Sequence, residues 1–110
     1  MEAKYITVLC TVPSQESARQ IAHTLINEKL AACCNIVPGL TSVYFWKGEV
    51  CEDAELLLII KTTAAAFESL RERIRAIHPY EVPEIIALPI IKGHQDYLNW
   101  VEENVGKQEQ

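Results

Sequence analysis

Hydrophobic and polar positions alternate at the start of the chain and then change to a helical spacing. From Lys4 to Val12 an apolar side chain occupies every second position, which is typical of a strand with one buried face. Pro13 ends this strand and Ser14 is a good helix cap. Apolar residues then recur at the i, i+3, i+4, i+7 spacing, so an amphipathic helix is predicted to run to about Leu30.

Two long strands are expected next, joined by a tight turn. The stretch from Cys33 to Trp46 is rich in β-branched and aromatic residues and is interrupted by Pro38-Gly39, which indicates a bulge or bend. Lys47-Gly48-Glu49 has the composition of a hairpin turn. The return strand, Val50 to Lys61, is polar near the turn and becomes solidly apolar from Leu56 to Ile60.

The second half of the chain predicts a helix, a strand and a last short helix. Thr62 or Thr63 can cap the first of these helices, whose buried stripe consists of Phe67, Leu70, Ile74 and Ile77. A strand is expected from Glu84 to Ile91, and Gly93 ends it. The last helix is expected at about Asp96 to Asn104.

The element order β-α-β-β-α-β-α predicts an α+β fold of the ferredoxin-like, split βαβ type. Four antiparallel strands would carry two helices on one face, and the last strand would lie beside the first. Residues 1–110 would form a single domain, with 106–110 as a flexible tail. The apolar runs Leu56–Ile60 and Ile85–Ile91 do not alternate, so both faces of the sheet should be buried, and we expect a homo-oligomer.

Composition and charge narrow the classes of partner. The 110 residues carry a net charge of −5, which gives no electrostatic reason to expect nucleic acid or an anionic membrane. The chain shows no signal peptide and no run of apolar residues long enough to span a bilayer. Its four cysteines, without a sign of export, predict reduced thiols in the cytoplasm.

Functional groups are concentrated in the stretch His78-Pro79-Tyr80-Glu81-Val82-Pro83-Glu84. Its two prolines restrict the backbone, and the predicted topology brings it next to Cys10 at the end of the first strand. Cys10 and His78, with Glu81 and Glu84 as possible additional ligands, could bind a borderline or soft metal ion. The alternative is an inert thiol in the core, because the chain has no CxxC or HxxxH pair.

Catalysis is a weaker hypothesis than binding. Cys10 and His78 could form a thiol–imidazole pair, but nothing in the sequence supplies an oxyanion hole, a GxSxG motif or a P-loop. We therefore expect no enzymatic activity. The acidic residues of the hairpin could form a cation site or simply a solvated face, and both readings stay open for Glu49, Glu52, Asp53 and Glu55.

Several motifs together resemble one family. They include Ser42-Val43-Tyr44-Phe45-Trp46-Lys47-Gly48, the HPYEVPE stretch 78–84, and Tyr97-Leu98-Asn99-Trp100. In combination they resemble the divalent-cation tolerance protein family, CutA, over nearly the whole chain. The resemblance implies a subunit similar to the PII signalling proteins, assembled as a trimer with strands paired between subunits.

The resemblance also implies a site and a function. Family members are implied to bind copper through a first-strand cysteine and a histidine before the HPYExPE proline, which here are Cys10 and His78, and other divalent cations are possible. Some members carry a second histidine where this chain has Ile77, so one proposed ligand is missing.

Three functional hypotheses follow. They are a non-catalytic trimer for copper and divalent metal tolerance, a PII-like small-molecule sensor, and a scaffold for partner proteins. Four aromatic residues are assigned first to subunit packing, with a ligand pocket as the alternative, namely Tyr44, Trp46, Tyr80 and Trp100.

Overall fold

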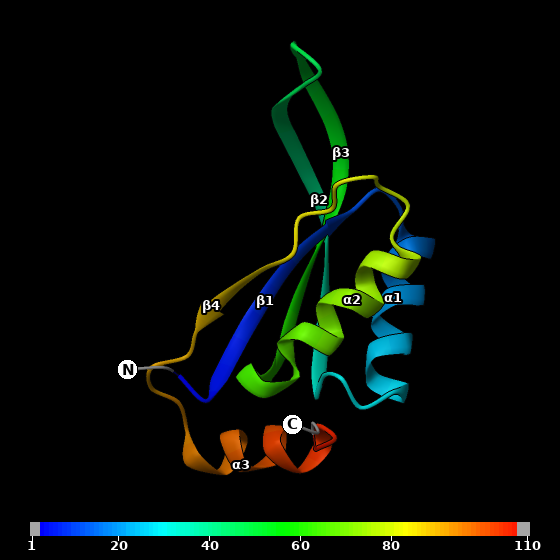
Figure 1. Ribbon diagram of the computed structural model, residues 1–110. Coiled ribbons are helices and arrows are strands. Elements are labelled where there is room, and N and C mark those ends of the chain that lie inside the picture. Colours follow the sequence, from blue (N-terminus) through cyan, green and yellow to red (C-terminus); the bar gives the residue numbers. More distant parts are fainter. Residues whose placement is uncertain (1–2, 108–110) are drawn as a thin grey trace.

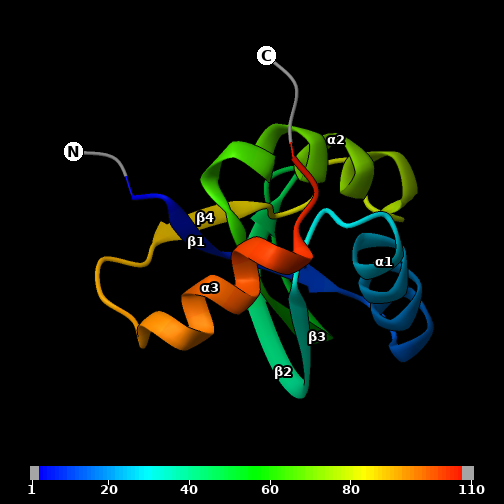
Figure 2. The same cartoon turned by 90° about the horizontal axis from the view of Figure 1, so that it is seen from below.

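The computed structural model describes residues 3–107 and has a four-stranded antiparallel sheet with three α-helices. The strand order is β2-β3-β1-β4, and α1 and α2 cover one face while α3 lies across one end of the sheet (Figures 1 and 2). This arrangement confirms the predicted ferredoxin-like fold. The elements are β1 (Tyr5–Val12), α1 (Gln15–Asn27), β2 (Cys33–Trp46), β3 (Glu49–Thr63), α2 (Phe67–Ile77), β4 (Ile86–Pro89) and α3 (Gln95–Asn104).

β1 is a central strand and holds the two halves of the chain together. It pairs with β3 from Tyr5↔Thr63 to Val12↔Leu56, and with β4 from Ile6↔Pro89 to Leu9↔Ile86. The last strand therefore lies antiparallel beside the first, as predicted. Every second side chain of β1 is buried under the helices, because residues i and i+2 of a strand share a face.

α1 ends earlier than the predicted Leu30. Its N-terminus is capped as expected, with the Ser14 side chain accepting a hydrogen bond of 3.1 Å from the Ser17 N–H. At the other end Lys29 adopts a left-handed conformation with φ of +59°, so the helix stops at Asn27. The Leu30 N–H then closes the end on the Leu25 carbonyl at 2.9 Å.

The β2–β3 hairpin extends well beyond the rest of the sheet (Figure 1). The predicted bulge is present, since the register shifts between Val37 and Leu40 and Gly39 has φ of +88°. The turn is narrower than expected. It consists of Lys47 and Gly48, both at positive φ, and Glu49 already pairs with Trp46.

The connection from β3 to α2 differs from the prediction. β3 continues through Thr63, and a short 3₁₀ turn, Ala64–Ala66, precedes α2. Thr62 does not cap a helix, because its hydroxyl donates to the Leu30 carbonyl at 2.7 Å, and the Thr63 side chain makes no capping bond. The predicted stripe of α2 is confirmed, with Leu70 and Ile74 fully buried.

β4 is shorter than the expected strand from Glu84 to Ile91. Pro83, just before the strand, and Pro89, its last residue, have no N–H to donate to a ladder, which is tolerated at the edge of a sheet. A last backbone bond of 3.0 Å joins the Ile90 N–H to the Tyr5 carbonyl. β4 is therefore a short edge strand.

The sheet face away from α1 and α2 is only partly covered. Ile86 and Leu88 of β4 each keep 49% of their surface exposed, and Ile91 after the strand keeps 84%. Leu57 and Ile59 on β3 are half-buried. This open face is the one that the non-alternating apolar pattern predicted to need a cover, and in the single chain it remains apolar and accessible.

The C-terminal stretch was expected to be a flexible tail over 106–110. The N–H of Gly106 donates to the Lys29 carbonyl at 2.8 Å, so this residue is held against the end of α1. Residues 108–110 lie outside the described part. None of the helices in residues 3–107 is both long enough and apolar enough to cross a membrane.

Candidate functional site

The segment 78–84 leaves α2 abruptly and runs over the end of the sheet. His78 is the C-terminal cap of α2, with an extended ψ of 138°, because the residue before a proline avoids the helical region. Its backbone N–H still donates to the Ile74 carbonyl at 2.8 Å. The proline thus turns the chain and directs the His78 side chain back towards β1.

His78 is buried, with 8% of its surface exposed, and both ring nitrogens have partners. Nε2 lies 2.8 Å from the carbonyl oxygen of Thr11 on β1, and Nδ1 accepts the Tyr80 N–H at 3.0 Å. An acceptor at Nδ1 and a carbonyl at Nε2 assign the proton to Nε2, which makes the ring neutral. The imidazole therefore ties the segment to the end of β1.

Cys10 lies beside this histidine on the helix-facing side of β1. Its Sγ is 3.8 Å from the same Thr11 carbonyl oxygen, and the residue is fully buried. Burial, and then the nearby charge of Glu84, raise the pKa of the Cys10 thiol to about 12. The structure brings Cys10 and His78 together, as the topology predicted, with the thiol protonated at neutral pH.

The other expected ligands are less closely gathered. Glu81 and Glu84 are exposed on the connecting segment, and Ile77 occupies the position next to His78 on the helix. Within residues 3–107 no three His, Cys, Asp or Glu side chains are grouped closely enough to hold a metal ion. The assignment of Cys10 and His78 as metal ligands therefore stays a prediction.

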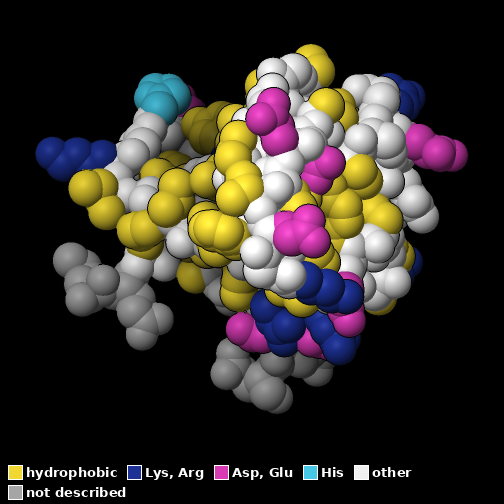
Figure 3. Space-filling model, turned by 90° about the horizontal axis from the view of Figure 1, so that it is seen from above, with side chains coloured by type: hydrophobic (Ala, Val, Ile, Leu, Met, Phe, Trp, Pro, Cys, Tyr) yellow, Lys and Arg dark blue, Asp and Glu magenta, His cyan; other side chains and the backbone are white. Residues whose placement is uncertain are grey.

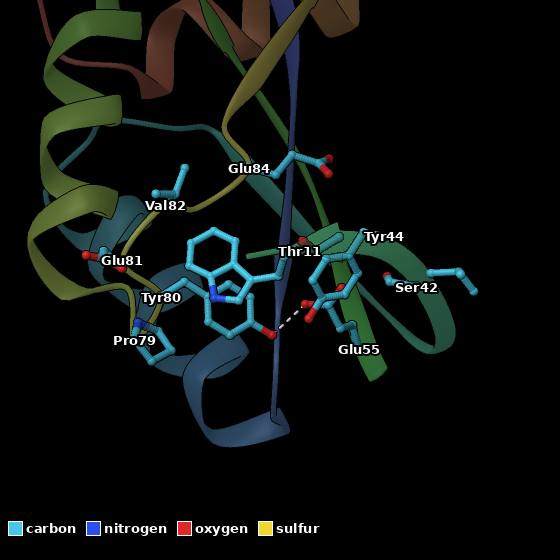
Figure 4. Close-up of a pocket in the computed structure, with 11 residues that line it drawn as sticks. Thr11, Ser42, Tyr44, Glu55, Pro79, Tyr80, Glu81, Val82 and Glu84 are labelled. Atoms are coloured by element: carbon cyan, nitrogen blue, oxygen red, sulfur yellow. Dashed lines mark hydrogen bonds between the residues drawn. The ribbon is translucent and has the colours of Figure 1, made fainter. Parts of the chain in front are cut away.

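A pocket of about 620 Å³ lies where the segment 78–84 crosses the base of the hairpin (Figure 4). Figure 3 views the molecule from above and shows acidic side chains among hydrophobic ones on that side. Its volume is in the range of small-molecule sites. β1 contributes one residue, β2 four, β3 one and the segment five. The lining residues are Thr11, Ser42, Val43, Tyr44, Trp46, Glu55, Pro79, Tyr80, Glu81, Val82 and Glu84.

Two tyrosine–carboxylate pairs lie at this pocket. The Tyr80 hydroxyl donates to Glu55 Oε2 at 2.6 Å, and the Tyr44 hydroxyl donates to Asp53 (Figure 4 draws the first pair). Burial and the Glu55 carboxylate raise the pKa of Tyr80, and the bond to Asp53 raises that of Tyr44 to about 12. Both phenols are therefore neutral donors at physiological pH.

The burial of Glu55 was not predicted from the sequence. Only 6% of its surface is exposed, although it was grouped with the solvated acidic residues of the hairpin. The available signal was its position, since it directly precedes the apolar run that begins at Leu56. At that point the hairpin joins the body of the sheet, and the segment 78–84 covers it.

The four aromatic residues assigned to subunit packing divide into two groups. Tyr44, Trp46 and Tyr80 line the pocket. Trp100 lies on α3 at the other end of the sheet, where its ring centroid is 5.6 Å from that of Tyr97. Trp100 and Tyr97 keep 42% and 39% of their surfaces exposed, so they are available for packing against another subunit.

The fold and sequence together match a known family. Residues 6–104 match the family model described as CutA1 divalent ion tolerance protein. The chain belongs to this family. The family is named for tolerance to divalent ions.

Individual relatives agree with this assignment. The chain is 64% identical over 99 residues to the divalent-cation tolerance protein CutA of Thermus thermophilus, covering 90% of this chain and 96% of the relative. It is 53% identical over 97 residues to a chloroplastic CutA of Oryza sativa, covering 88% of this chain but only 55% of that longer protein. The crystal structure of CutA1 from Oryza sativa superposes with a TM-score of 0.93 at 48% identity, covering 97% and 98% of the two chains.

Proposed function

We propose that the protein acts in tolerance to divalent metal ions as a non-catalytic homotrimer that binds copper. One observation supports the metal site above the others. Cys10 Sγ and His78 Nε2 approach the same Thr11 carbonyl oxygen, at 3.8 and 2.8 Å. A thiolate and an imidazole so close together are a donor pair that favours copper over hard cations such as Mg²⁺.

Copper binding requires a local rearrangement of this pair. His78 Nε2 has a lone pair for a metal ion only after the ring proton has left it. The hydrogen bond from Nε2 to the Thr11 carbonyl is then replaced by a bond from Nε2 to the ion. The Cys10 thiol must also lose its proton, which the ion's positive charge favours. Glu84 is close enough to influence that thiol electrostatically and is a candidate for a further ligand.

The open face of the sheet supports the homotrimer. Apolar side chains that remain half exposed in one chain become buried when a second copy covers them, which stabilises the assembly. Tyr97 and Trp100 on α3 are further exposed aromatic side chains that a second copy could bury. All four cysteines are free, and we place the protein in a reducing compartment, the cytoplasm.

A copper titration tests the proposed metal site. Chelator-treated, reduced protein is titrated by calorimetry and passed through gel filtration, beside Cys10→Ser and His78→Ala. Matched controls are Cys51→Ser near the hairpin turn and His94→Ala, whose side chain is 79% exposed. We expect a fixed ratio of copper per subunit that both site variants lose and both controls keep. Equal binding by all five proteins would remove Cys10 and His78 from the site.

A second candidate function is a PII-like small-molecule sensor. The pocket at the base of the hairpin favours it, because its volume suits a small ligand and it is distinct from the buried Cys10 thiol. A ligand bound there would raise the melting temperature of metal-free protein by mass action. A screen of small metabolites by thermal shift, with the metal removed, separates this function from metal binding.

A further inference from the structure

The lining of the pocket carries negative charge and no positive charge. Three carboxylates line it, from Glu55, Glu81 and Glu84, and no lysine, arginine or histidine is among the lining residues. Asp53 lies beside them through its bond to Tyr44. The lining carboxylates would therefore repel an anionic ligand and attract a cation.

Glu55 is the buried carboxylate of the lining, and it has no counter-charge among the described residues of the lining. Only 6% of the surface of Glu55 is exposed, and its hydrogen-bonding partner is the neutral hydroxyl of Tyr80. Among residues 3–107 no lysine, arginine or histidine nitrogen forms an ion pair with it. A buried charge without a counter-charge is costly, and a ligand cation in the adjoining pocket would offset that cost.

Three aromatic rings line the same pocket as this carboxylate. Figure 4 shows the ring of Tyr44 and the hydroxyl of Tyr80 gathered beside Glu55, and Trp46 completes the set. Aromatic faces attract organic cations, with tryptophan the strongest. The Trp46 ring already has the Lys47 ammonium 5.8 Å from its centroid, although Lys47 is not a lining residue.

We propose that this pocket binds a small organic ammonium ion, with Glu55 as its counter-charge and Tyr44, Trp46 and Tyr80 around it. The inference rests on the second proposed function, the small-molecule sensor, and names the chemical class of its ligand. Cationic nitrogen bearing alkyl groups suits the site because weakly hydrated cations gain most from aromatic contacts.

A metal ion fits this pocket less well than an organic cation. Divalent cations need several oxygen or nitrogen donors converging at about 2.0 to 2.6 Å. Within the described residues no three acidic, cysteine or histidine side chains converge in that way. To lie among the aromatic rings, a small, strongly hydrated ion would also have to lose bound water, which it does reluctantly.

Choline and its neutral isostere 3,3-dimethyl-1-butanol form a matched pair of probes. Both are titrated into the native, metal-free oligomer by isothermal calorimetry, with tryptophan fluorescence as a second readout. We expect choline to bind at least tenfold more tightly than the neutral alcohol, since they differ mainly in charge. Equal affinity of the two would overturn the proposal by making the pocket merely apolar.

Two pocket variants and two controls locate the binding. Glu55→Gln keeps an acceptor for Tyr80 but removes the charge, and Trp46→Leu removes the strongest aromatic face. Each is expected to weaken choline binding roughly tenfold or more, which is about the size of one such interaction. Glu52→Gln on the exposed hairpin and Trp100→Phe on α3 lie outside the pocket and should bind as the parent does. Unchanged binding in both pocket variants contradicts the proposal.

The remaining outcomes separate this inference from the function on which it rests. Adenosine monophosphate binding with choline failing to bind would preserve a small-molecule sensor and overturn the cation class. Displacement of choline by Mg²⁺ or copper in proportion to metal occupancy would make the pocket a metal site instead. If no probe of either charge binds and a second copy of the chain fills the pocket, both the inference and the sensor function fail.

Discussion

Tyr5 at the start of β1 donates its hydroxyl hydrogen bond to Glu102 on α3, with 2.8 Å between Tyr5 Oη and Glu102 Oε1. Lys4 Nζ lies 3.1 Å from the same oxygen. These two contacts join the first and last elements of the fold. They also hold the pKa of the Glu102 carboxyl below its usual range, first through the bond from Tyr5 and then through Lys4.

This pairing predicts a pH dependence of stability. A carboxyl with a depressed folded pKa contributes stability above its unfolded pKa, near 4.5, and loses it as the pH falls through the folded value. Glu102→Gln should therefore lose less stability than the parent between pH 5 and pH 3. Denaturant unfolding at both pH values measures this, with Glu103→Gln on the same helix as control. Identical losses in parent and Glu102→Gln would show that the pair contributes nothing.

The reactivity of Cys10 follows from its burial. Its thiol is fully buried and its pKa is raised to about 12, and the pKa of Cys34 is raised equally, chiefly by burial. Thiolate is the reactive species, so both should react with a disulfide reagent at pH 8 at least 100-fold more slowly in native protein than in denaturant. Mass spectrometry of the labelled peptides identifies each site. The labelling rate of half-buried Cys51 in the same native protein is the internal reference. Rapid labelling of Cys10 in the native protein would contradict the prediction.

Removal of the Tyr80 hydroxyl tests how much its hydrogen bond to buried Glu55 stabilises the fold. Tyr80→Phe leaves a buried carboxylate without its donor, and we expect a loss of about 1–3 kcal/mol in the free energy of unfolding. Tyr44→Phe removes the corresponding bond to exposed Asp53 and should cost less than about 0.5 kcal/mol. Guanidinium unfolding of both variants gives the comparison. Equal losses would indicate that the burial of Glu55 has no energetic consequence.

A charge on the open face should disrupt the proposed homotrimer. Leu88 is 49% exposed on β4, so Leu88→Lys leaves the single chain foldable but puts an ammonium into the apolar surface that subunits would share. We expect sedimentation velocity at micromolar concentration to show a shift from trimer towards monomer. Gln20→Lys on the exposed side of α1 is the matched control. A trimer that tolerates Leu88→Lys unchanged would place the interface elsewhere.

The fold was largely predictable because its signals are local. Periodicity located every strand and helix, Pro38-Gly39 located the bulge, and the right-handed crossovers placed β4 beside β1. The errors lie at element ends, where other interactions decide. α1 ends at Asn27 because Lys29 adopts a left-handed conformation, and Thr62 donates across the fold instead of capping a helix. Such interactions produce no local pattern in the sequence.

The site was predictable only in part. Two prolines and a split βαβ topology brought His78 to the end of β1, where it meets the Thr11 carbonyl. A ligand pocket was predicted only as the alternative role of Tyr44, Trp46 and Tyr80, and its other walls were not, because they depend on the segment 78–84 folding over the hairpin. In the sequence Glu55 resembles the other solvated acidic residues of the hairpin, because only the folded segment 78–84 covers it. Burial that comes from a distant segment leaves no periodic trace in the sequence around it.

The central place of β1 has a consequence for biosynthesis. The strand is made first, yet its partners extend to Thr63 on one side and Pro89 on the other. A nascent chain therefore carries an apolar strand with two open edges until most of the protein has left the ribosome. Contacts so distant along the chain close slowly, and unpaired edges associate with other strands in the meantime. During synthesis, a chaperone that covers residues 5–12 would protect the part of the molecule that waits longest.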